Sequence, residues 1–222
     1  MSAHYSFPRT PHLAGSTVSD DDRVLTDAAF QSMAKDHHLV VQEKVDGTNV
    51  GIHFDAPGLI SLQKRSGPLA TGEHAQYNAF RSWAFERLDV LYELVGAKYV
   101  LFGEWLWAEH GMHYDALPDF FLAFDLMVKE SGEFLVTDEI VRQCGNMIHL
   151  VPILWRGTFQ DMPALLELVA HSHFSPQPAE GVYIRVENRN RVIGRCKWRR
   201  PGFKCGRNDF ASSLRRNALR HS

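Results

Sequence analysis

The most informative segment of the 222-residue chain is Glu43-Lys44-Val45-Asp46-Gly47-Thr48-Asn49. Apolar residues at 39–42 precede it and an alternating apolar pattern at 49–54 follows it, so a strand is predicted on each side. Gly47 can adopt backbone angles that other residues resist, which permits a tight turn and the close approach of a ligand. The segment therefore predicts a strand that delivers Lys44 into a turn. Lys-x-Asp-Gly alone is also typical of an ordinary hairpin with an exposed lysine.

The pattern of apolar residues predicts more strands than helices. Alternating segments lie at residues 39–42, 49–54, 59–63, 99–105, 120–128, 181–186 and 192–197. Helical periodicity is found at residues 75–95, 138–144 and 162–171. The helices are interspersed without a regular βαβ rhythm, so the predicted fold class is α+β with largely antiparallel sheets.

The composition is that of a globular protein, with 45% hydrophobic and 23% charged residues. No segment approaches the roughly 18 uninterrupted apolar residues of a membrane span. Residues 1–16 lack the apolar core of a secretory signal. The three scattered cysteines (Cys144, Cys196 and Cys205) contain no CxxC pair, which indicates free thiols in a reducing compartment. A cytoplasmic location without a membrane partner is therefore expected.

Charge is unevenly distributed, although the formal net charge is only −2. Only Glu187 and Asp209 oppose a run of basic residues toward the end of the chain: Arg185, Arg189, Arg191, Arg195, Lys197, Arg199, Arg200, Lys204, Arg207, Arg215, Arg216 and Arg220. The run predicts a local polyanion-binding surface, with a solvated basic tail as the alternative. Residues 208–220 are expected to form a short basic helix.

Histidines are numerous, and Glu109, His110 and His113 lie close together in the sequence. Their spacing is compatible with a metal site. Nothing else in the sequence supports zinc, so a surface cluster is the preferred interpretation.

EKVDGTN resembles the nucleotidyltransferase signature of the covalent ligase and capping-enzyme superfamily, and its flanks are most similar to the RNA ligase 2 branch. The resemblance implies that Lys44 attacks the α-phosphate of ATP and forms a lysyl-AMP phosphoramidate. It also implies that Asn49 contacts the phosphate or ribose, and that Glu43 faces the adenine. The implied architecture is a nucleotidyltransferase domain whose largely antiparallel sheets flank an ATP cleft.

The superfamily's other motifs follow in the family order. Lys64-Arg65-Ser66-Gly67 resembles the next motif, and Arg65 would contact the nucleotide. Phe102-Gly103-Glu104-Trp105 resembles the third, which implies that Glu104 binds the ribose hydroxyls. The aromatic of the following motif, residues 121–126, is Phe124, which would stack on adenine.

Two further motifs complete the resemblance. Glu180-Gly181-Val182-Tyr183-Ile184 resembles the fourth motif, in which Glu180 would help to hold the catalytic metal. Gly194-Arg195-Cys196-Lys197 resembles the last motif, in which lysines grip the α-phosphate. Lys197 takes that role, and Arg195 stands where the first lysine is expected. Arginine keeps the charge and can bind phosphate with two donors, but it does not titrate.

Transfer of AMP requires a neutral amine at Lys44 and groups that neutralise the phosphate charge. Lys44 must lose a proton, although a free lysine has a pKa of about 10.4. Arg65, Arg195, Lys197 and a divalent metal are expected to favour the neutral amine. Glu180 and Asp46 are expected to bind Mg²⁺ or Mn²⁺ through oxygen, with nucleotide phosphates completing the shell.

The resemblance places a nucleotidyltransferase domain at residues 1–206 and a basic helix or tail at 207–222, without a separate C-terminal domain. The expected activity is joining of RNA 5′-phosphate and 3′-hydroxyl ends through lysyl-AMP and an adenylylated 5′ end, in RNA repair. An end-healing kinase or phosphatase is a candidate partner that would supply substrate grip. The tail is expected to bind RNA and to be dispensable for self-adenylylation. The alternatives are a minimal DNA ligase or other lysyl-nucleotide transferase, and a degenerate module that only binds nucleotide or RNA.

Overall fold

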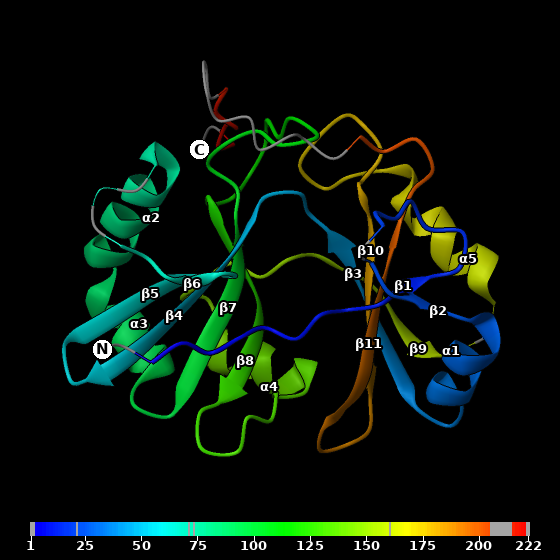
Figure 1. Ribbon diagram of the computed structural model, residues 1–222, viewed down its shortest axis with the longest axis horizontal. Helices are drawn as coiled ribbons and strands as arrows, with labels where there is room; N and C mark the ends of the chain where they lie inside the picture. The colour runs from blue at the N-terminus through cyan, green and yellow to red at the C-terminus, as the bar shows by residue number, and fades with distance from the viewer. Residues whose placement is uncertain are drawn as a thin grey trace.

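A computed structural model describes residues 3–20, 22–70, 72, 74–159, 161–204 and 215–220. Two β-sheets face one another, with helices on their outer sides and the helix at residues 137–144 between the two halves (Figure 1). The six-stranded sheet has the order β2 (Val24–Leu25), β1 (His12–Leu13), β11 (Val192–Arg199), β10 (Gly181–Glu187), β3 (His38–Lys44) and β9 (Ile153–Thr158). The five-stranded sheet has the order β6 (Gly67–Pro68), β5 (Leu59–Lys64), β4 (Thr48–Ala56), β7 (Tyr99–Trp105) and β8 (Phe121–Val128).

The α+β prediction is confirmed. Within the described residues, these strands pair antiparallel except at β1, which runs parallel to β2 and β11. The helices are α1 (Asp27–Ala34), α2 (Ala75–Glu86), α3 (Leu88–Val95), α4 (Thr137–Cys144), α5 (Met162–Glu167) and the 3₁₀ turn η1 (Leu168–Ala170). Within the described ranges, no helix has the length and apolar character needed to span a bilayer.

Several predicted boundaries differ from the structure. The helix predicted at 75–95 is divided at Arg87, whose φ of −117° and ψ of 21° leave the helical region. The segment predicted at 162–171 ends as η1 rather than as α-helix. Strand β9 was not predicted. Of the helix predicted at 208–220, residues 208–214 lie outside the described ranges, and residues 215–220 make isolated β-bridges instead.

The lysine-bearing segment is not a hairpin. Strand β3 ends at Lys44 in the six-stranded sheet, and β4 begins at Thr48 in the five-stranded sheet. The three residues between them therefore pass from one sheet to the other. This crossover places Lys44 where the two sheets meet.

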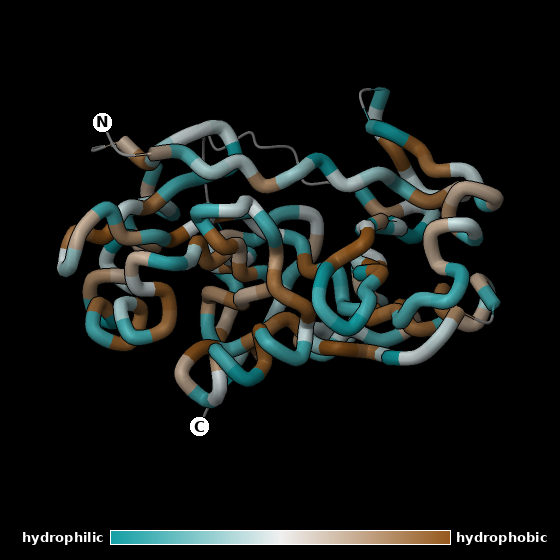
Figure 2. The backbone as a smooth tube through the Cα atoms, turned by 90° about the horizontal axis from the view of Figure 1, so that it is seen from below, coloured by the Kyte–Doolittle hydropathy of each residue, from teal (hydrophilic) through white to brown (hydrophobic). Residues whose placement is uncertain are grey.

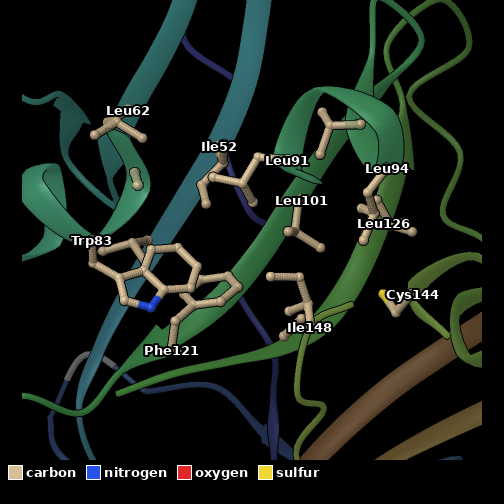
Figure 3. Close-up of a cluster of buried hydrophobic side chains, with 14 of the residues drawn as sticks. Ile52, Leu62, Trp83, Leu91, Leu94, Leu101, Phe121, Leu126, Cys144 and Ile148 are labelled. Atoms are coloured by element: carbon tan, nitrogen blue, oxygen red, sulfur yellow. The ribbon is translucent and has the colours of Figure 1, made fainter. Parts of the chain in front are cut away.

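Side-chain alternation decides which face of each sheet is buried under helices. On β4, Val50, Ile52 and Phe54 belong to a core cluster that includes residues of α2, α3 and α4. Figure 3 shows part of this cluster, in which Trp83 of α2 lies against Phe121 of β8. Because successive strand residues point to opposite faces, the intervening polar residues face the other sheet.

The six-stranded sheet follows the same rule. Its apolar residues, among them Val182 and Ile184 on β10, pack in a second cluster with residues of α1 and α5. The N-terminal segment crosses from one half of the molecule to the other (Figures 1 and 2). Tyr5 exchanges hydrogen bonds with Gln63 of β5, and His12 pairs with Lys197 of β11. The segment therefore ties the two sheets together.

Candidate active site

A pocket of about 590 Å³ lies between the two sheets. It is lined by every predicted site residue except Arg195, namely Glu43, Lys44, Asp46, Asn49, Arg65, Glu104, Phe124, Glu180 and Lys197. Side chains far apart in sequence therefore converge in one cavity. The cavity is large enough for a nucleotide-sized ligand.

The crossover after β3 forms one wall of the pocket. A Cβ atom on Gly47 would lie 2.6 Å from the carbonyl oxygen of Trp105, so only glycine permits this approach to β7. The N–H of Gly47 donates to Oε1 of Glu104 at 3.1 Å. The sequence predicted unusual backbone angles as the reason for Gly47. Gly47 does not have a positive φ, and the physical reason for glycine here is the close packing against β7.

Lys44 is held by a carboxylate. Its Nζ lies 2.7 Å from Oε2 of Glu180, and Nε of Arg199 lies 2.9 Å from Oε1 of the same side chain. Burial lowers the pKa of Lys44, but Glu180, Glu104 and Asp46 together raise it above the ordinary lysine value. Without the divalent metal that the expectation included, the carboxylates around Nζ outweigh the neighbouring cations and favour the charged amine.

The same crowding acts on the carboxyl groups. Burial raises the pKa of Glu104 to about 8; Lys44 opposes this shift, whereas Glu180 and Asp46 add to it. Burial, reinforced by Glu180, raises the pKa of Asp46 to about 6. Asp46, Glu104 and Glu180 thus crowd around Lys44, and a bound divalent cation would favour the charged form of these carboxyl groups.

Asp46 and Glu180 are the carboxylates that the sequence predicted as metal ligands. Asp46 and Glu180 offer the hard oxygen ligands that Mg²⁺ and Mn²⁺ prefer. No cluster of three metal-ligating side chains is assembled in the part of the chain that the structure describes. Two carboxylates supply only part of the roughly six or more oxygen ligands that such a cation takes, so a bound ligand would have to supply others.

A loop that sequence reasoning missed holds Asp46. This β7–β8 loop (residues 106–120) places the hydroxyl of Tyr114 2.7 Å from the backbone N of Asp46, which donates to it. The N–H of Gly111 donates to Oδ2 of Asp46 at 2.5 Å. The sequence carries no periodic pattern that would bring residues so distant from the crossover into contact with it.

The same loop brings a histidine to the pocket. His110 lines the cavity, with Nε2 3.3 Å from Oγ1 of Thr48, and burial lowers the pKa of His110. Glu109 and His113 instead contact each other at 2.8 Å. The interpretation of all three residues as a surface cluster is therefore wrong for His110.

The cations of β11 are placed differently from the prediction. Lys197 and Arg199 line the pocket, whereas Arg195 does not. Nη2 of Arg195 lies 3.1 Å from Oδ2 of Asp125, and its guanidinium lies 4.1 Å from the ring centroid of Phe134. The structure gives Arg195 an internal ion pair and brings Arg199 to the site. The two-residue strand period of Lys197-Trp198-Arg199 is the signal that could have identified Arg199.

Arg185 also departs from the basic surface predicted at the end of the chain. It is fully buried between Asp125, at 2.6 Å, and Glu187, at 2.7 Å. Burial lowers the pKa of Arg185, but the two carboxylates outweigh this effect and raise it. Its charge is therefore neutralised internally and is not available to a polyanion.

The N-terminal segment forms a second wall. Phe7, Pro8 and Thr10 line the pocket, and β1 runs alongside β11. Burial, reinforced by Lys44, lowers the pKa of Lys197 to about 8, while Asp22 opposes this shift from 3.8 Å. The segment both braces the sheet and shapes the cavity.

The remaining predicted residues lie around the cavity. The carboxylate of Glu43 accepts hydrogen bonds from Ser172 Oγ at 2.5 Å and from the backbone N–H of His173 at 2.9 Å. Phe124 contacts Phe7 edge-on, with ring centroids 5.2 Å apart. Sequence reasoning missed the segment around Ser172, since nothing in its composition indicates contact with β3.

Comparison with solved structures shows the same fold in an RNA ligase of Naegleria gruberi. A mutant with ATP and Mn shares 16% identity and a TM-score of 0.56, covering 87% of this chain and 60% of that chain. A mutant with AMP and Mn shares 18% identity and a TM-score of 0.53, covering 88% and 60%. An apo mutant shares 18% identity and a TM-score of 0.55, covering 89% and 61%.

The chain spans about 60% of the length of these structural relatives. At such identities the likeness concerns the fold. No curated protein matches the sequence. The family model described as RNA ligase, however, matches residues 37–204, about three quarters of the chain and the whole span from β3 to the end of β11. The chain therefore belongs to the RNA ligase family.

Proposed function

We propose that this chain is an ATP-dependent RNA ligase that carries AMP on Lys44. The observation that carries the proposal is the convergence of Lys44, Glu180, Lys197 and Arg199 in one pocket between the sheets. A nucleophile, a carboxylate and two cations are the groups that nucleotidyl transfer needs. Membership of the RNA ligase family supports RNA as the nucleic-acid substrate.

In the first step, Nζ of Lys44 attacks the α-phosphorus of ATP. A P–N bond forms, the P–O bond to the leaving group breaks, and pyrophosphate departs. Glu180 contacts the ammonium at 2.7 Å and orients Nζ, which loses its proton to solvent before it attacks. Lys197 and Arg199 bind phosphate oxygens on which negative charge accumulates.

A divalent cation, Mg²⁺ or Mn²⁺, would be held by Asp46 and Glu180 and would neutralise phosphate charge. Glu104 accepts hydrogen bonds from the ribose hydroxyls, and Phe124 stacks on the adenine. We assign Glu43 to face the adenine and Asn49 to contact the phosphate or ribose. Arg65 is assigned to contact the nucleotide. All of these residues line the same cavity.

In the later steps, AMP moves from Lys44 to a 5′-phosphate, forming a 5′-to-5′ pyrophosphate linkage. A 3′-hydroxyl then attacks the activated phosphate, a phosphodiester forms, and AMP leaves. Repair of broken RNA in the cytoplasm, with an end-healing kinase or phosphatase as partner, is the setting we assign. The buried free thiols of Cys144 and Cys196 are consistent with a reducing compartment.

Sealing of nicked duplexes tests the assignment of substrate. Two matched substrates carry the same 5′-phosphate and differ only in ribose or deoxyribose at the 3′-hydroxyl end. An RNA ligase seals the ribose-ended nick faster. Faster sealing of the deoxyribose-ended nick favours the DNA ligase alternative. Binding of nucleotide without AMP transfer or sealing of either substrate favours a degenerate binding module.

A further inference from the structure

The β7–β8 loop contacts the crossover at Asp46 through two hydrogen bonds, one from each partner. The backbone N–H of Asp46 donates to the hydroxyl of Tyr114, and the N–H of Gly111 donates to the carboxylate of Asp46. Tyr114 is completely buried. The β7–β8 loop therefore positions both the backbone and the side chain of Asp46, which lies two residues after Lys44.

Residues 215–220 in turn fix this loop. Figure 1 shows them beside it, although they are distant in sequence. The backbone N–H of Tyr114 donates to Oδ1 of Asn217 at 2.9 Å, and the N–H of Ala218 donates to the carbonyl of Tyr114 at 2.8 Å. Both backbone polar groups of Tyr114 are thus satisfied by this segment.

Asn217 also reaches the start of the loop. Its Nδ2 donates to the carbonyl oxygens of Leu106, at 2.7 Å, and Ala108, at 3.2 Å. Only 4% of Asn217 is exposed, in contrast to its exposed neighbour Arg216. A buried carboxamide with all of these partners joins the start of the loop to its middle, beside the residues that contact Asp46, which is more than a solvated tail requires.

We propose that residues 215–220 form a positioning segment for AMP transfer, in which Asn217 acts through Tyr114 to hold Asp46 beside Lys44. This rests on the proposed function for its kinetic consequences. It also replaces the expectation that residues 207–222 are dispensable for self-adenylylation. Loss of the Asn217 side chain would leave the N–H of Tyr114 and the carbonyl of Leu106 without their hydrogen-bond partners.

Point variants of the full chain test the proposal. Tyr114→Phe removes one hydroxyl, Asn217→Ala removes the carboxamide, and Arg220→Ala is a matched control at an exposed position of the same segment. Each variant is assayed for AMP transfer to Lys44 and for the Mn²⁺ concentration that gives half the maximal rate. We expect Tyr114→Phe and Asn217→Ala each to raise that concentration by about 10- to 100-fold, as loss of groups that orient metal ligands does.

The double variant separates positioning from general loss of stability. If Asn217 acts through Tyr114, the double variant is impaired little more than the worse single variant, since both remove the same restraint. The proposal is contradicted if the two fold-changes in the Mn²⁺ concentration multiply in the double variant. It is also contradicted if Tyr114→Phe and Asn217→Ala require the same Mn²⁺ concentration as Arg220→Ala.

Amide hydrogen exchange in the ligand-free protein gives a readout that does not depend on activity. Peptides covering residues 45–48 and 106–120 are expected to exchange faster in Asn217→Ala than in Arg220→Ala, at a temperature where both remain folded. Unchanged exchange overturns the proposal. A wild-type chain that forms no AMP adduct refutes the proposed function instead, and the exchange result still decides whether Asn217 positions the loop.

Discussion

At the scale of single residues, the chemistry depends on how charge is shared around Lys44. Glu180 binds both Lys44 and Arg199, so one carboxylate orients the nucleophile and a pocket cation together. This arrangement keeps the amine protonated before ligand binds. Binding of a triphosphate and a divalent cation must therefore change the charge balance before Lys44 can attack.

Substitutions in β11 distinguish the role of Arg199 in AMP transfer from that of Arg195 in stability. Arg199→Ala is expected to lower the rate of AMP transfer by about 100-fold, because it removes a cation from the pocket. Arg195→Ala is expected to leave that rate close to wild type and to lower the free energy of unfolding by about 1–3 kcal/mol, because Asp125 loses one partner. Single-turnover labelling and urea unfolding measure the two effects. The reverse pattern would restore Arg195 as the phosphate-binding residue.

The pH dependence of nucleotide binding reports on Lys197 and Glu104, whose pKa values are both about 8. As pH rises through 8, Lys197 loses its positive charge and Glu104 becomes negative. Both changes disfavour a triphosphate, so binding of an ATP analogue that cannot donate AMP is expected to be about tenfold weaker at pH 9 than at pH 7.

Two variants show which of the two residues causes the pH dependence of binding. Lys197→Arg keeps its charge at pH 9 and is expected to flatten the profile, and Glu104→Gln removes the other titration. Equilibrium titrations of the analogue at constant ionic strength provide the measurement. Equal affinity of the wild-type protein at pH 7 and pH 9 would contradict the charge balance described for the pocket.

At the scale of secondary structure elements, Arg185 of β10 connects the two sheets. Its guanidinium contacts Asp125 on β8 and Glu187 on β10, and it donates to the carbonyl of Leu135 at 2.6 Å. Glu187 also accepts a hydrogen bond from the N–H of Thr137 at the start of α4. The facing strands and α4 are therefore joined by one buried network.

Removal of Arg185 leaves two buried carboxylates without their main partner. Arg185→Met is expected to lower the free energy of unfolding by about 3–5 kcal/mol. Arg191→Met, at an exposed position, is expected to change it by less than about 0.5 kcal/mol. Urea unfolding compares the two variants at neutral pH. Equal stabilities would show that the network does not hold the sheets together.

Local patterns were sufficient to predict the strands that carry the site. Alternation on β10 and β11 identified both strands, and the motif order identified nine of the residues that line the pocket. Contacts between distant segments left no such signal. The hydrogen bond from Asp46 to Tyr114 depends on how the β7–β8 loop folds back, and the burial of Arg185 depends on Asp125 in the opposite sheet.

At the scale of the whole molecule, function follows from two sheets that each bury an apolar face under helices and turn a polar face toward the other. The crossover from β3 to β4 places Lys44 at their junction, and the N-terminal segment spans both sheets. We assign the nucleotidyltransferase domain to residues 1–206, with residues 215–220 packed onto its β7–β8 loop.

Intact-mass spectrometry after incubation with ATP and Mg²⁺ or Mn²⁺ tests the central claim most directly, with Lys44→Ala as the control. We predict that the wild-type chain gains the mass of one AMP and that the variant gains none. A folded wild-type protein that is not already adenylylated, and that forms no adduct with any nucleotide or metal, would contradict the assignment of Lys44 as the nucleophile.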